Sequence, residues 1–113
     1  MTREGLARIR YVVEPRFCNP RGTLQGGMFA VYVDEAMGYA VLSLLGGEAR
    51  FATTDLVVHY LRPVVPGEDG TATVIAEARV IRLGRSTAYL EGEVRDADGE
   101  VCARASSTVM LLS

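Results

Sequence analysis

Residues 28–45 read Met-Phe-Ala-Val-Tyr-Val-Asp-Glu-Ala-Met-Gly-Tyr-Ala-Val-Leu-Ser-Leu-Leu, directly after the run 19–27, Asn-Pro-Arg-Gly-Thr-Leu-Gln-Gly-Gly. The almost wholly apolar stretch predicts a helix over residues 25–45, which Gly46 and Gly47 end. Asp34 and Glu35 are the only charged residues between 28 and 45. An ionised carboxylate in an apolar setting must be paired, neutralised or solvated in a pocket. The acid pair is therefore the first place to look for chemistry.

The rest of the chain is strand-like. Residues 7–14 predict a strand before the helix, and four more are predicted at 51–61, 71–83, 86–95 and 101–112. We expect these last four to form an antiparallel meander. A helix of ~20 residues spans about 30 Å, a length similar to these strands. The sequence thus predicts an α+β fold in which a curved antiparallel sheet wraps around one long central helix. The open edges of such a sheet favour an oligomer.

Composition limits the possible classes of function. The 113 residues are expected to form a single domain, 1–113, with a net charge of −2 and no basic stripe for nucleic acid. Cys18 and Cys102 are far apart and lack neighbouring Cys or His, so no metal site is predicted; a bridge between them stays open. A reducing cytoplasm is the simplest location. Residues 1–11 do not resemble a secretory signal. Residues 28–45 could resemble a short membrane span, but the acid pair and the following strands favour a core helix.

The neighbours of the two acids differ in size along the helix. Asp34 lies one turn from Ala30 and from Gly38, whose small side chains leave room for a ligand or water. The same small residues could instead allow close helix packing, with Asp34 bonded to a partner chain. Glu35 is expected to be a supporting or ion-pairing group.

Gly26 and Gly27 open the predicted helix. Unpaired N–H groups and the helix dipole make this end suitable for developing negative charge, and glycine lets a substrate approach the backbone. An ordinary glycine-containing helix start is the alternative reading. An acid eight residues further on suggests an oxyanion donor combined with a base.

Three segments together point to a family. The first consists of Asn19, residues 22–24, Gly26, Gly27, residues 34–36 and Gly38. The second is Thr-Asp-Leu-Val-Val-His-Tyr-Leu-Arg-Pro at 54–63, and the third is Gly-Arg-Ser-Thr-Ala at 84–88. In this order they resemble the signatures of the hotdog-fold thioesterases of the PaaI type, over nearly the whole chain.

The resemblance implies hydrolysis of an acyl-CoA thioester at a subunit interface, without a cofactor. Asp34 would be the catalytic carboxylate, as general base or nucleophile, and the Gly26 N–H would polarise the carbonyl with Asn19 close by. Thr53 falls where family members carry a hydroxyl residue that helps hold the attacking water. In the family Asp34 and Gly26 typically come from different subunits. A homotetramer built as a dimer of dimers is implied, with no membrane or nucleic-acid partner.

The chain departs from the family at one catalytic position. Family members commonly have His before the two glycines, where this chain has Gln25. A Gln side chain can donate a hydrogen bond but cannot shuttle protons. A non-catalytic acyl-CoA binding module is therefore the alternative function.

Other polar residues are assigned to binding or to structure. Gly27, Arg62, Arg82, Arg85 and Ser86 are candidates for substrate binding, the arginines for the CoA phosphates. His59, the only histidine, is expected to form a cross-strand pair, which makes a hotdog dehydratase the least favoured function. Phe29, Tyr32, Met37 and Tyr39 are expected to lie mostly in the core, although they could line an acyl pocket. The acyl group itself is left open.

Overall fold

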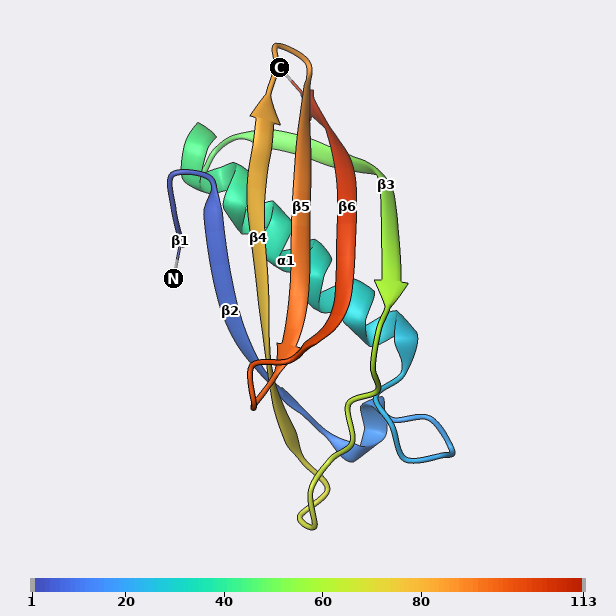
Figure 1. The fold of residues 1–113 in the computed structure, drawn as a ribbon. Helices are drawn as coiled ribbons and strands as arrows, with labels where there is room; N and C mark the ends of the chain where they lie inside the picture. The colour runs from blue at the N-terminus through green and yellow to red at the C-terminus, as the bar shows by residue number, and fades with distance from the viewer. Residues whose placement is uncertain (1, 113) are drawn as a thin grey trace.

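A long helix lies along one face of an antiparallel sheet in the computed structural model, which describes residues 2–112 except for the side chain of Arg3 (Figure 1). The elements, in chain order, are β1 (Thr2–Arg3), β2 (Leu6–Val13), the 3-10 turn η1 (Pro15–Phe17), α1 (Gly26–Leu45), β3 (Arg50–Tyr60), β4 (Ala72–Leu83), β5 (Thr87–Asp96) and β6 (Val101–Leu112). The predicted helix and the five predicted strands are each confirmed to within one residue. β1 and η1 are additional.

The helix begins and ends where the glycines predict. Gln25 precedes it in an extended conformation, and Gly46 follows it with φ of 96°, a backbone angle that glycine adopts readily. The Gly46 N–H donates to the Leu42 carbonyl at 2.8 Å and closes the last turn. The buried face of α1 is apolar and consists of Phe29, Tyr32, Val33, Ala36, Met37, Ala40 and Val41. The composition of α1 would also suit a membrane span, but here it is the core helix of the sheet.

The strand order corrects the predicted meander. The sheet runs β1-β2-β4-β5-β6-β3, and every neighbouring pair is antiparallel. β4, β5 and β6 do form a meander, whereas β3 pairs with β6 at the far edge and β2 pairs with β4. The prediction was wrong because residues 61–71, which contain Pro63 and Pro66, are too long for a tight hairpin and cross the end of the sheet.

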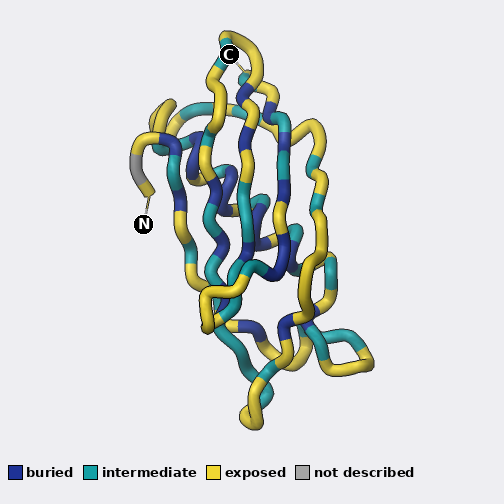
Figure 2. Tube along the Cα trace, viewed as in Figure 1, coloured by how far each residue is buried: buried dark blue, intermediate teal, exposed yellow. Residues whose placement is uncertain are grey.

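The two faces of the sheet have opposite character. Alternate residues of β4, β5 and β6 point toward α1 and are almost fully buried, among them Val74, Ala76, Leu90, Val94 and Val109. Figure 2 shows these buried positions on the helix and on the central strands that lie over it. The core therefore lies between α1 and the inner face of the sheet.

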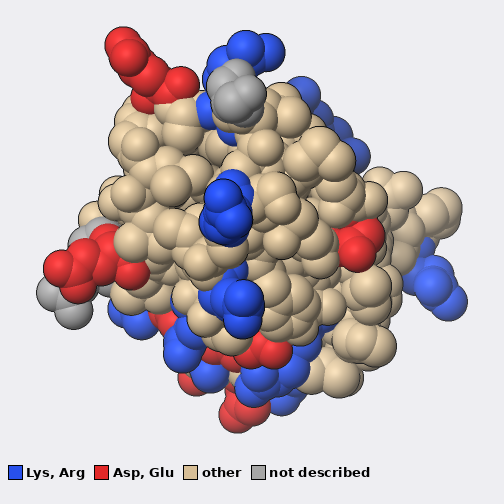
Figure 3. Space-filling model, turned by 90° about the horizontal axis from the view of Figure 1, so that it is seen from above, with Lys and Arg blue, Asp and Glu red and all other residues tan. Residues whose placement is uncertain are grey.

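The outer face carries charges in ion pairs. Glu77 on β4 binds Arg8 at 2.6 Å and Arg79 at 3.1 Å, while Glu93 on β5 binds Arg95 at 2.7 Å and Arg104 at 3.5 Å. Glu77 and Glu93 face each other across the two strands, which would be unfavourable without these arginines. Seen from the end with the β4–β5 turn, mixed charges gather along the lower margin, which corresponds to this face (Figure 3).

Gly92 sets the distance between the helix and the sheet. A Cβ at this position would lie 2.7 Å from Val33 Cγ2 on α1 and 3.0 Å from the Glu77 carbonyl oxygen. Real Cβ atoms do not approach other atoms so closely, so any larger residue must push the helix or β4 away. Glycine at position 92 therefore allows α1 to pack closely on the sheet.

We expect Gly92→Ala to destabilise the fold by about 1–3 kcal/mol, because the added methyl overpacks the helix–sheet contact. Equilibrium denaturation monitored by circular dichroism measures the change. Gly47→Ala is the matched control, since a Cβ there meets no atom within 4 Å; its effect should stay within about 0.5 kcal/mol. Equal stabilities for the two variants would contradict this account of Gly92.

Candidate functional site

Asp34 lies half-buried on the side of α1 that faces the edge strand β3. Thr53 on β3 donates its hydroxyl proton to Asp34 Oδ1 at 3.1 Å. No ion pair reaches Asp34 among the residues that the structure describes. The carboxylate is thus held by one neutral hydroxyl, with Oδ2 left for another partner. Thr53, which the resemblance assigns to holding an attacking water, thus contacts the Asp34 carboxylate directly.

A β-bulge explains why Thr53 faces the helix. The β3–β6 register shifts between Thr53, which pairs with the buried Val109, and Asp55, which pairs with Thr108. Asp55 Oδ1 accepts the Thr108 N–H at 2.7 Å, and the hydroxyl of Thr54 donates to the Thr108 carbonyl at 2.9 Å. These bonds fix the bulge, and the bulge turns Thr53 inward.

Glu35 lies on the other side of α1 from Asp34, toward β2, since successive residues of a helix are about 100° apart. Tyr11 on β2 donates a short hydrogen bond to Glu35 Oε1. Burial, together with this bond, raises the pKa of Tyr11 well above its usual range, so its hydroxyl remains a donor. Glu35 is therefore a supporting group, as predicted, and the two acids serve different sides of α1.

Two backbone donors are free at the start of α1. The Met28 N–H donates to the Gln25 carbonyl at 3.0 Å, but neither Gly26 nor Gly27 donates its N–H to any group in the described structure. Both groups sit at the positive end of a 20-residue helix. They can therefore bind an oxygen that carries developing negative charge.

Gln25 and Asn19 precede these glycines and are used differently. The Gln25 side chain is exposed and makes no hydrogen bond in the described structure, so its amide is available to a ligand. Asn19 donates to the Thr23 hydroxyl at 2.8 Å and accepts the N–H groups of Arg21 and Thr23 at 3.0 and 3.2 Å. Asn19 thus holds the loop before the helix, and no hydrogen bond joins it to Gly26.

A cavity of about 350 Å³ opens beside Gly26. Its walls come from the loop before α1, the first turn of α1 and the end of β3 with the segment that follows. The lining residues are Thr23, Leu24, Gly26, Phe29, Tyr60, Leu61, Arg62 and Pro63. Arg62 is the one charged residue among them and forms a long ion pair with Glu100, at 3.7 Å. Of the predicted phosphate-binding arginines, only Arg62 lines this cavity.

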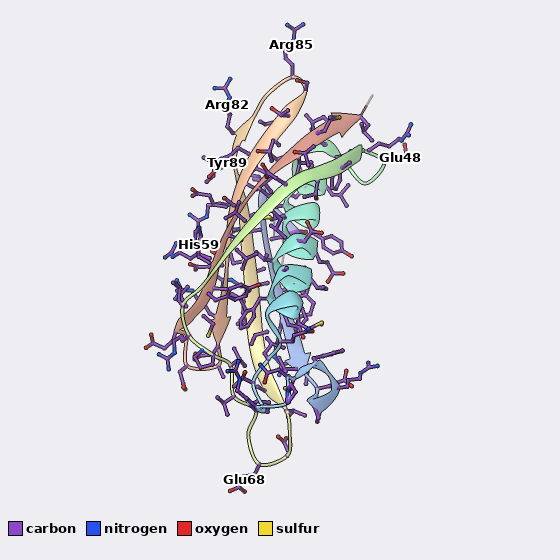
Figure 4. The ribbon with its side chains drawn as sticks, turned by 90° about the vertical axis from the view of Figure 1, so that its right-hand side faces the viewer. Glu48, His59, Glu68, Arg82, Arg85 and Tyr89 are labelled. Carbon is purple, nitrogen blue, oxygen red and sulfur yellow. The ribbon has the colours of Figure 1, made fainter. Side chains whose placement is uncertain are left out.

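Gly27 lies at the start of α1, whereas the other predicted binding residues lie elsewhere on the chain. Arg82 lies near the end of β4 and Arg85 in the β4–β5 turn, at the opposite end of the sheet from the start of α1, and Ser86 belongs to the same turn (Figure 4). His59 points away from the helix on the outer face, in register with Arg104, as its predicted cross-strand role requires. One chain therefore does not bring the β4–β5 turn to Gly26.

Asp34 and Gly26 are also separated within one chain. Eight residues of helix correspond to roughly 12 Å along the axis. A base and an oxyanion donor must each lie about 3 Å from the reacting group. A single copy of the chain therefore cannot direct both groups at one carbonyl.

The residues that the structure describes form neither a disulfide nor a metal centre. Cys18 and Cys102 are both free thiols, so the bridge that the sequence left open is absent. Within residues 2–112 no cluster of His, Cys, Asp and Glu has the arrangement of a metal site.

Comparison with known proteins identifies the family. A family model described as "Thioesterase superfamily" matches residues 21–103. The chain belongs to the thioesterase superfamily. Its structural neighbours include PaaI proteins, so the predicted hotdog fold and PaaI-type relationship are confirmed.

Individual relatives agree with this assignment. Human acyl-coenzyme A thioesterase 13 is 30% identical over 85% of this chain and 66% of its own length. PaaI of Thermus thermophilus, in a mutant structure, has a TM-score of 0.85 at 28% identity, over 99% of this chain and 90% of that one. A thioesterase-like protein of Streptococcus pneumoniae, solved with coenzyme A, shares the fold with a TM-score of 0.88 at 18% identity, over 100% of this chain and 83% of that one. This chain spans only 57% and 62% of the first two curated relatives that it matches.

The contacts of two tyrosines at the site, Tyr60 and Tyr11, were not predicted from the sequence. Tyr60 donates to the Gly26 carbonyl at 2.9 Å across 34 residues of chain, and Tyr11 bonds Glu35 across 24. Tyr60 lies within the 54–63 signature, which marks its position but not its contact. Only the packing of β2 and β3 beside α1 reveals these bonds.

Proposed function

We propose that this protein hydrolyses acyl-CoA thioesters, with each active site formed by two copies of the chain. The proposal rests on the hydrogen bond from Thr53 to the Asp34 carboxylate, which has no other partner among the described residues. Membership of the thioesterase superfamily and the acyl-CoA activity named for its human relative support the same reaction and substrate class.

Asp34 can act in either of two ways. As a general base, it takes a proton from water, whose oxygen attacks the thioester carbon; as a nucleophile, its own oxygen attacks and water then hydrolyses the resulting anhydride. Thr53 occupies Oδ1 and orients the carboxylate, so Oδ2 is the reacting atom. In both routes the C–S bond breaks, and the CoA thiolate leaves and takes up a proton.

The carbonyl oxygen gains negative charge as its carbon is attacked. The free Gly26 N–H at the start of α1 stabilises this charge, and the exposed Gln25 amide is available as a further donor. Because Gln25 cannot transfer protons, Asp34 carries all of the proton transfer by side chains in this scheme.

Pairing between the β3 strands of two copies would bring Asp34 of one copy close to Gly26 of the other. β3 is an edge strand that, within the described part of the chain, pairs with β6 alone, and it exposes Val57 and Tyr60, with Leu61 beyond its end. Such an apolar edge is suited to pairing with a second chain. If two β3 strands pair antiparallel about a twofold axis near the middle of the strand, the end that contacts Gly26 lies beside the partner strand's Thr53 region. Gly26 of one copy then approaches Asp34 of the other.

The same twofold arrangement also brings the predicted substrate-binding residues of the two copies to one end of the dimer. Because it reverses the direction of the partner, the partner's β4–β5 turn lies at the same end of the dimer as the start of α1 (Figure 1). Arg82, Arg85 and Ser86 of one copy, with Arg62 and Gly27 of the other, then line one path for the CoA phosphates and pantetheine.

Gln25 favours one alternative, a module that binds acyl-CoA without hydrolysing it. It would retain the backbone donors and the arginines but lack an effective proton-transfer group. Tight binding of acyl-CoA without thiol release across a panel of chain lengths distinguishes this module from the enzyme.

Asp34→Asn should lower the rate of thiol release from acyl-CoA by about 10²- to 10⁴-fold, because an amide neither accepts the proton nor attacks the carbonyl. Glu35→Gln is the matched control: it changes the adjacent acid on the other side of α1 and should retain nearly full activity. Equal rates for wild type and Asp34→Asn would remove Asp34 from the mechanism.

Gly26→Pro tests the backbone donor and the two-chain site together. Proline is tolerated at the first helical position and removes the N–H there, so activity should fall about 10²- to 10³-fold while the fold is retained. Circular dichroism checks the fold, because the ring must displace Tyr60 slightly.

Refolding a mixture of Gly26→Pro and Asp34→Asn chains should restore up to about a quarter of wild-type activity, since half of the dimers are mixed and each contains one intact site. Either variant refolded alone is the control. No recovery in proven mixed dimers would show that Gly26 and Asp34 act within one chain.

A further inference from the structure

Tyr60 touches the backbone of Gly26 in two ways. Its hydroxyl donates to the Gly26 carbonyl oxygen at 2.9 Å, and its ring lies so close that a Cβ on Gly26 would be 3.2 Å from both Cζ and the hydroxyl oxygen. The same ring packs edge-on against Phe29 in the first turn of α1, with 5.6 Å between the ring centroids. The side chain of Tyr60 is thus fixed against the start of the helix.

The bonded carbonyl belongs to the same peptide group as the free Gly27 N–H. In a peptide group, a hydrogen bond accepted by the oxygen draws electron density from the nitrogen and makes its N–H a stronger donor; the strengthening is about 10–30% per bond. The bond also fixes the plane of the peptide, and therefore the direction in which the Gly27 N–H points. Tyr60 therefore binds the carbonyl side of this peptide and leaves the Gly27 N–H on the other side available to a ligand.

We propose, on the basis of the proposed acyl-CoA hydrolysis, that Tyr60 is a positioning residue that orients and polarises the Gly26–Gly27 peptide, so that the Gly27 N–H joins the Gly26 N–H in binding the thioester oxygen. Both donors are free and adjacent at the same helix end. Tyr60 also lines the cavity beside Gly26, so a substrate bound there lies against its ring.

The need for glycine at position 26 follows from the same contact. Any side chain at this position must displace the Tyr60 ring by a few tenths of an ångström and disturb its hydrogen bond. The effects of Gly26→Ala and Tyr60→Phe on kcat should therefore overlap, and the double variant should lose less than the product of the two single losses.

Tyr60→Phe keeps the ring and removes only the hydroxyl. We expect kcat to fall about 5- to 10-fold with KM changed less than about twofold, because the bond strengthens as charge develops on the thioester oxygen. Tyr89→Phe is the matched control, since Tyr89 lies on the outer face, where its hydroxyl is 3.5 Å from Glu91. It should have wild-type kinetics.

The infrared stretching frequency of a ¹³C-labelled thioester carbonyl bound to the Asp34→Asn protein tests whether Tyr60 positions the oxygen donors or only stabilises the fold. Donors on the oxygen lower the frequency, and Asp34→Asn with Tyr60→Phe should lower it less than Asp34→Asn alone. An unchanged frequency, or unchanged kcat in Tyr60→Phe, would overturn the role of Tyr60 while hydrolysis through Asp34 stands. Full activity of Asp34→Asn would instead remove Asp34 from the mechanism, and no thiol release by the wild-type protein from any acyl-CoA would overturn the proposed function.

Discussion

The close packing of α1 on the inner face of the sheet is the constraint on which the other features depend. It requires Gly92, because Val33 and the Glu77 carbonyl occupy the space that a side chain would need. With the apolar face of α1 held this closely, the flanks of the helix come within hydrogen-bond reach of β2 and β3. Asp34 then meets Thr53 on one flank, and Glu35 meets Tyr11 on the other.

This arrangement separates two adjacent acids chemically. Glu35 is occupied by a tyrosine that is kept protonated by burial and by the acid itself. Among the described residues, Asp34 has a single neutral donor and a second oxygen without a partner, on the side of the helix where the sheet ends. A carboxylate in that position can accept a proton or attack an ester, whereas Glu35 is held in the structure.

The edge strand β3 connects these local features to a larger assembly. It carries Thr53, which holds the carboxylate, and Tyr60, which holds the start of the helix. A single chain keeps Asp34 and Gly26 roughly 12 Å apart, because both belong to one straight helix. The proposed twofold pairing of β3 resolves this separation without any change in the fold. The ionic outer face of the sheet, where Glu77 and Glu93 are each held by two arginines, takes no part in the proposed site.

Local sequence patterns predicted much of this molecule. The apolar run with Gly46 behind it determined the helix, and alternating β-branched runs separated by Gly and Pro determined the strands, because these signals act between residues that are close in the chain. The motif around Asn19, Gly26 and Asp34 indicated the family and the residues of the candidate site. The order of the strands could not be predicted from local signals. The path of residues 61–71 depends on the pairing of β3 with β6, which lies far away in the sequence. The contacts of Tyr60 and Tyr11 were likewise decided by tertiary structure, because hydrogen bonds across tens of residues exist only once the helix and sheet have packed.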